Sequence, residues 1–84
     1  ERKVSPNLYK NLLELKGEIQ KGQAINVAVK QARMQIEKNF KLDYIETLDA
    51  NTLKQITDNT SEIAILCAIF IGSTRLIDNV IFRR

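Results

Sequence analysis

The run Ile63–Ile71 limits the possible folds of this chain more than any other segment, because all nine of its residues are apolar. At about half the length of a helix that crosses a bilayer, it predicts no membrane span. Its isoleucines and the Gly72 that follows favour a strand over a buried helix, which is the alternative that the pattern leaves open. As a strand, the run is apolar on both faces and therefore belongs in the middle of a sheet.

Two helices are predicted before this strand, because apolar residues recur there at three- and four-residue spacing. The first covers about residues 7–20, and Ser5 and Pro6 are either its N-cap and first position or part of a helix that begins earlier. The second runs from about Ala24 to Asn39. Gly22 lies between them, and so short a connection favours an antiparallel pair.

The remaining segments predict two more strands and their connections. Residues 42–48 alternate as a strand does, and Asp49 is a good cap for a single helical turn over residues 49–53. Residues 57–61 form a polar loop, and Gly72-Ser73 forms a hairpin turn before a last strand over residues 74–82.

These elements predict an α+β fold, with two antiparallel helices packed on a small three-stranded antiparallel sheet in one domain of residues 1–84. Two helices cover only one face of such a sheet. Since the central strand is apolar on both faces, the other face exposes an apolar patch of the kind that marks a partner surface.

Composition excludes several classes of function. The chain has no His and a single Cys, so a Cys/His zinc cluster and a Ser-His-Asp triad are excluded, and its three glycines do not assemble a P-loop. The net charge of +3 is too small to indicate a nucleic-acid partner, although residues 1–41 carry +5 and residues 42–84 carry −2. A lone cysteine fits a reducing compartment, so a cytoplasmic protein is expected.

Two charged groups are candidate sites. Asp43, Glu46 and Asp49 suggest acid–base chemistry or a hard-cation site. On a strand, however, Asp43 and Glu46 face opposite sides, and Asp49 looks like a cap, so a structural role is favoured for these three residues.

A second group of charged residues lies on the second helix and at its end, namely Lys30, Arg33, Lys38 and Lys41. Glu37 interrupts this group and no exposed aromatic residue lies between its members, which favours a solvated surface over a phosphate-binding stripe.

Three single residues are predicted to be core residues rather than site residues. Cys67 lies in an apolar strand without a His to activate it, which predicts an inert thiol. Tyr9 and Tyr44 occupy periodic positions, where aromatic side chains are more often buried than in contact with a ligand.

The last strand contains an unusual polar motif. Arg75, Asp78 and Asn79 interrupt an otherwise apolar segment. A polar network that fixes strand register is favoured, with Arg75 paired to Asp43 or Asp78. The alternative is that Arg75 binds phosphate.

The segment around this motif, residues 69–80, resembles the C-terminal signature of the pantoate–β-alanine ligase family. Residues 42–46 resemble the family's strand after the helix pair, and residues 1–10 resemble the stretch that enters its C-terminal domain. The three segments follow the family's order and together span nearly the whole chain.

The resemblance implies part of an ATP-dependent ligase that adenylates pantoate and then lets β-alanine displace AMP. The family's Rossmann-like domain, its HIGH-type motif and its phosphate-contacting loop lie upstream of Glu1, so no catalytic, cofactor-binding or metal-binding residue is carried onto this chain. ATP and Mg²⁺ are expected on that N-terminal domain, and residues 1–84 are expected to form an inactive lid. The whole enzyme is expected to be a cytoplasmic homodimer, without a nucleic-acid or membrane partner.

Two other classes of function stay open from the residues alone. One is a free-standing interaction or dimerisation module, which a gene that begins and ends at these residues would favour. The other is a weak nucleic-acid binder, which would bind in a salt-sensitive manner.

Overall fold

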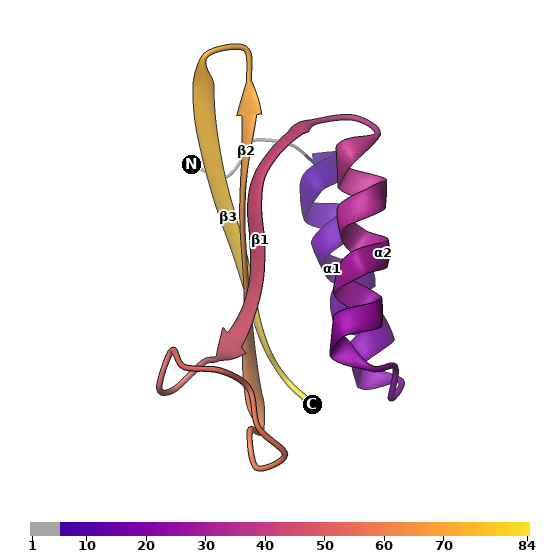
Figure 1. Ribbon diagram of the computed structural model, residues 1–84, viewed down its shortest axis with the longest axis vertical. Helices are drawn as coiled ribbons and strands as arrows, with labels where there is room; N and C mark the ends of the chain where they lie inside the picture. Colours follow the sequence, from indigo (N-terminus) through magenta and orange to yellow (C-terminus); the bar gives the residue numbers. More distant parts are fainter. Residues whose placement is uncertain (1–5) are drawn as a thin grey trace.

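The computed structural model describes residues 6–84. Its elements, in chain order, are α1 (Pro6–Gln20), α2 (Ile25–Glu37), β1 (Lys41–Asp49), β2 (Glu62–Ile71) and β3 (Thr74–Arg83). The strands form one antiparallel sheet in the order β1-β2-β3, and both helices lie side by side along one face of it (Figure 1). The predicted α+β fold is confirmed.

The core lies between the helices and the face of the sheet formed by the odd-numbered residues of β2. Ile63, Ile65, Cys67 and Ile69 are completely buried there. The register of β2 with its neighbours places Ile45 beside Cys67, Val80 beside Ile65 and Phe82 beside Ile63. The helices contribute the buried residues Leu8, Leu12, Leu15, Ile19, Ala28, Ala32 and Ile36.

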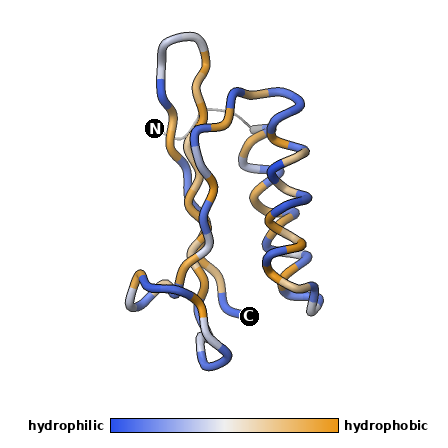
Figure 2. The backbone as a smooth tube through the Cα atoms, in the orientation of Figure 1, coloured by the Kyte–Doolittle hydropathy of each residue, from blue (hydrophilic) through white to orange (hydrophobic). Residues whose placement is uncertain are grey.

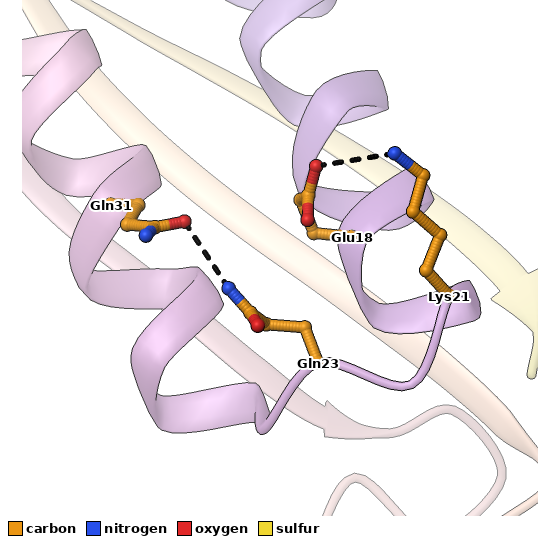
Figure 3. Close-up of polar contacts among 4 residues, drawn as sticks. All are labelled: Glu18, Lys21, Gln23 and Gln31. Atoms are coloured by element: carbon orange, nitrogen blue, oxygen red, sulfur yellow. Dashed lines mark hydrogen bonds and ion pairs between the residues drawn. The ribbon is translucent and has the colours of Figure 1, made fainter.

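Glycine ends α1 as the sequence predicts. Gly22 has a φ of +102°, and its N–H donates to Ile19 O while the Gln23 N–H donates to Glu18 O. These two bonds form a Schellman motif, which satisfies carbonyls at the end of the helix. An ion pair between Glu18 and Lys21 and a hydrogen bond from Gln23 to Gln31 flank the connection (Figure 3).

Helix α2 is slightly shorter than predicted at both ends. Ala24 is its N-cap, with extended backbone and no side-chain hydrogen bond, and the helix stops at Glu37 rather than Asn39. At the start of α1, Pro6 is the first described helical residue. The predicted N-cap Ser5 lies outside the described residues.

The segment after β1 differs from its prediction. Strand β1 extends to Asp49, and residues 50–52 form a turn rather than a helix. The Leu53 N–H donates to Asp49 O, but Leu53 itself has a φ of +62°. A residue in the left-handed region cannot continue a right-handed helix, so the helical turn ends as soon as it has formed.

The β2–β3 hairpin has the predicted turn at Gly72 and Ser73. Gly72 has a φ of +63°, which glycine adopts without a steric penalty. Strand β3 then runs one residue beyond its predicted end, to Arg83.

We define the open face as the side of the sheet turned away from the helices. Residues that point to it are Lys41, Tyr44, Glu46 and Leu48 of β1, Glu62, Ala64, Leu66, Ala68 and Phe70 of β2, and Arg75, Ile77, Asn79, Ile81 and Arg83 of β3. No described helix covers this face (Figure 1). Hydrophobic and hydrophilic residues alternate along the helices, whereas β2 is almost uniformly hydrophobic (Figure 2). The predicted uncovered apolar face is therefore present among residues 6–84.

We predict that Ile65→Ala lowers the free energy of unfolding by about 2–5 kcal/mol, because it leaves a cavity at a completely buried position. Met34→Ala is the control, since Met34 is 58% exposed on α2, and it should change the stability by less than about 0.5 kcal/mol. Urea denaturation of both variants measures the difference. Equal stability of the two variants would contradict the assigned core.

Candidate functional site

A polar cluster lies on the open face near the β2–β3 hairpin. Arg75 Nε donates to Asp43 Oδ2 at 2.8 Å, which confirms the predicted pairing with Asp43. The guanidinium carbon of Arg75 also lies 5.7 Å from the centre of the Tyr44 ring, and Lys41 Nζ lies 5.9 Å from the centre of the Phe70 ring. The cluster joins all three strands, as a network that fixes strand register should.

The prediction that Asp43 and Glu46 face opposite sides of the sheet is wrong. Strand β1 has a register irregularity between Leu42 and Tyr44, and such a bulge interrupts the alternation of side chains. Asp43 therefore reaches Arg75 on the open face, where Glu46 also points. The Asp43 carboxylate is thus held by a partner within the fold, which supports a structural role.

The other two residues of the polar motif do not join this cluster. Asp78 lies opposite Cys67 on the helix-facing side and is only 8% exposed. Its Oδ1 accepts a hydrogen bond from the Asn79 N–H at 2.8 Å. Asn79 points to the open face, opposite Leu66. Arg75, Asp78 and Asn79 thus do not converge on one point where a ligand would bind.

Asp49 organises the loop that joins β1 to β2. Its Oδ1 accepts the N–H groups of Asn51 and Thr52 at 2.8 and 3.1 Å, and its Oδ2 accepts the Thr60 hydroxyl at 3.0 Å. The hydrogen bonds from Asn51, Thr52 and Thr60 lower the pKa of Asp49 below its ordinary value. The capping role predicted for Asp49 is confirmed, with a turn in place of the helix.

A cleft of about 840 Å³ lies between the start of α2, β1 and the loop at residues 55–58. Lys30, Arg33 and Arg84 line it. The Arg84 guanidinium is hydrogen-bonded within the protein, because it donates to Thr57 O and Thr60 O at 2.7 and 3.0 Å. Sequence patterns did not predict that Arg84 binds the loop before β2, since both of its partners are backbone carbonyls.

The predicted cationic stripe does not form one continuous surface. Lys30, Arg33 and Lys38 are exposed on or next to α2, and Arg33 lies 3.9 Å from Glu37. Lys41 belongs to β1 and lies over an aromatic ring on the open face. The interpretation of these residues as solvated surface cations is supported.

Neither tyrosine is a core residue, so that prediction is wrong. Tyr9 is 40% exposed on α1, because the helix turns Leu8 and Leu12 toward the sheet instead. Tyr44 points to the open face, where it stacks with Arg75.

Two structural features are absent from residues 6–84. No three His, Cys, Asp or Glu side chains of this range lie close enough together to hold a metal ion. Neither described helix has the length and apolar character needed to cross a bilayer.

Cys67 is the completely buried residue at the centre of the core. Burial, with the nearby Asp78 carboxylate, raises the pKa of its thiol to about 11, although Arg33 acts in the opposite direction. A thiol with this pKa is almost entirely protonated at neutral pH and is therefore a poor nucleophile. The structure agrees with the predicted inert role.

We predict that Ellman's reagent modifies native Cys67 at pH 8 at least about 100-fold more slowly than it modifies the protein in denaturant, because folding suppresses the thiolate and blocks access. A Ser73→Cys variant, with its added thiol in the exposed hairpin turn, is the control and should show one fast and one slow thiol. Fast modification of native Cys67 would contradict its assigned environment.

Comparison with known proteins gives a consistent result. Residues 1–81 match the family model described as pantoate–β-alanine ligase. A pantothenate synthetase of Vesicomyosocius okutanii is 55% identical over 80 residues, which are 95% of this chain and 28% of that protein. A pantothenate synthetase of Ruthia magnifica is 50% identical over 84 residues, which are all of this chain and 30% of that protein.

The fold is also known from solved structures. A crystal structure of pantothenate synthetase from Thermus thermophilus superimposes with a TM-score of 0.76 at 23% identity, over 92% of this chain and 31% of that one. The chain thus spans about 30% of the length of the relatives that it matches. Because the family model covers nearly every residue, this chain belongs to the pantoate–β-alanine ligase family.

Proposed function

We propose that these residues form the C-terminal lid domain of an ATP-dependent ligase that joins pantoate and β-alanine to give pantothenate through a pantoyl-adenylate. The observation that carries the proposal is the family match over residues 1–81, combined with coverage of only 28–30% of the relatives. The larger enzyme is proposed to work as a cytoplasmic homodimer.

The described residues do not fit ATP or Mg²⁺. Mg²⁺ is held by oxygen ligands such as carboxylates, yet Asp43 is paired with Arg75 and Asp49 is saturated by loop hydrogen bonds. Of the three cations that line the cleft, Arg84 is bound to backbone carbonyls, Arg33 lies near Glu37, and Lys30 is exposed on α2. We therefore assign nucleotide and metal binding to the N-terminal domain of the longer chain.

A domain without catalytic residues still has a chemical task in such an enzyme. Water hydrolyses an acyl-adenylate, so a ligase benefits from a rigid cover that closes over ATP and pantoate and excludes solvent. Residues 6–84 have the packed core and the hydrogen-bonded loop that a rigid body needs. We propose that the open face is the surface that this lid turns toward the rest of the enzyme.

We predict that the 84-residue chain does not bind ATP appreciably, because its cations are paired or dispersed. ATP titrated to several millimolar should leave the amide NMR spectrum almost unchanged. Pyrophosphate at the same concentration is the control for general ionic effects. Saturable shifts at Arg75, Asp78 and Asn79 with ATP alone would show that the network is a ligand site.

We predict that the longer enzyme loses pantoyl-adenylate formation when residues 1–84 are deleted, while its affinity for pantoate stays within a few-fold. The physical reason is that the lid excludes water and does not hold pantoate by itself. Single-turnover measurement of adenylate formation and equilibrium binding of pantoate test the two parts separately. An unimpaired rate of adenylate formation would refute the lid role.

Matched substitutions in the full-length enzyme separate loss of the lid surface from loss of folding. Ile77→Glu changes the open face, whereas Met34→Glu places the same side chain on the exposed surface of α2. Only Ile77→Glu should slow adenylate formation. Equal effects of the two variants would show that the open face is not the covering surface.

A further inference from the structure

The turn after β1 holds Leu53 in an unusual backbone conformation. Its φ is +62°, and among residues 6–84 no other residue except glycine has a positive φ. An L-residue in this left-handed region strains the backbone, and apart from glycine only asparagine and aspartate adopt it with any ease. A glycine or an asparagine at position 53 would form the same turn at lower cost. The backbone therefore does not explain why a leucine stands there.

Leu53 is also the most exposed of the large hydrophobic residues in this range, at 64%. It takes no part in the core, whereas Ile56 of the same loop packs against the core cluster. A single exposed leucine is common on protein surfaces. A leucine that is both exposed and strained is explained neither by packing nor by solubility, and backbone strain of this kind is typical of functional positions.

Hydrogen bonds on both sides of Leu53 fix its position. The Leu53 N–H donates to Asp49 O at 2.8 Å, and the Asp49 N–H donates to Lys54 O at 2.9 Å. The Lys54 N–H donates in turn to Thr52 Oγ1 at 3.1 Å. The Asp49 carboxylate also accepts the N–H groups of Asn51 and Thr52. The turn is thus ordered before it meets a partner, which lowers the entropic cost of binding.

The direction of the turn indicates which partner it meets. After β1 the chain projects to the side of the sheet away from the helices, which is the side of the open face (Figure 1). This chain also spans only 28–30% of its relatives, so more than two thirds of such an enzyme lies outside it. We propose that Leu53 is an anchor that enters an apolar recess in the rest of the enzyme when the lid closes, an inference that rests on the proposed lid role.

The neighbours of Leu53 define the kind of recess that it fits. They are polar and exposed, namely Asn51, Thr52, Lys54 and Gln55. A lone leucine among polar residues fits a pocket of its own size with a polar rim rather than a broad apolar surface. Burial of the side chain in such a pocket favours the closed state by roughly tenfold or more.

Thiol accessibility in the full-length enzyme tests whether position 53 becomes covered. In a Leu53→Cys variant, Ellman's reagent should modify the added thiol about tenfold more slowly when ATP and pantoate are present than when they are absent, because cysteine packs as a small apolar residue. The unsubstituted enzyme gives the rate of its own thiols. Met34→Cys on the exposed surface of α2 is the control and should react equally fast in both conditions.

Two further substitutions separate the side chain from the strained backbone. Leu53→Gly keeps the turn, since glycine adopts a positive φ freely, and should leave the melting temperature of the 84-residue chain unchanged or higher. In the full-length enzyme the same variant should slow adenylate formation by roughly tenfold, because the anchor is lost. Leu53→Met keeps an apolar side chain of similar size and should retain most of the rate.

Three results would overturn the proposal. The first is a Leu53→Cys thiol whose reactivity ATP and pantoate do not change, and the second is a wild-type rate of adenylate formation in Leu53→Gly. The third is protection of this thiol in the 84-residue chain alone as its concentration rises, because the partner would then be a second copy. If deletion of residues 1–84 abolishes adenylate formation while Leu53→Gly does not slow it, the lid role stands and only the anchor is wrong.

Discussion

The two-sided hydrophobicity of β2 is the constraint on which the rest of the structure depends. A strand with Ile63, Ile65 and Ile69 on one face must be covered there, and α1 and α2 provide that cover. Burying these side chains stabilises the fold by roughly 2 kcal/mol each, which is large compared with the net stability of a small domain. Because β1 and β3 pair with β2 on its two sides, its position also fixes theirs. The opposite face carries Leu66 and Phe70, so the same strand that builds the core also creates the apolar part of the open face.

Periodicity, residue type and the positions of the glycines were enough to predict the element order, the strand character of β2 and both glycine turns. Each of these depends on a local property, such as alternation or the ability of glycine to adopt a positive φ. The features that sequence patterns did not predict depend on contacts between distant residues or on small shifts of one element against another. The bulge in β1 that turns Asp43 toward Arg75 leaves no mark on the pattern of apolar residues, and the exposure of Tyr9 depends on how far α1 rotates against the sheet. The role of Arg84 depends on carbonyl groups 24 and 27 residues away.

The polar residues of this chain illustrate the difference between a charge network and a reaction site. Arg75, Asp43 and Asp49 all have short hydrogen bonds, yet each bond joins one part of the fold to another. Catalytic groups need donors and acceptors directed at a common point, whereas the bonds of these groups join different parts of the protein. The polar motif around Arg75 therefore joins parts of the fold, and its side chains do not meet at a common point.

The contact between α1 and β3 joins the first and last described elements of the chain. Gln20 Nε2 donates to Arg83 O at 3.0 Å across a sequence separation of 63 residues, while the sheet and the helix pair form between neighbours in sequence. Loop closure over such a distance is entropically expensive, and contacts of this kind slow folding. The helical hairpin and the three-stranded sheet are therefore expected to form first as separate units and to dock late. During synthesis on the ribosome, the apolar stripe of α1 would therefore not be fully buried until the chain up to β3 has emerged.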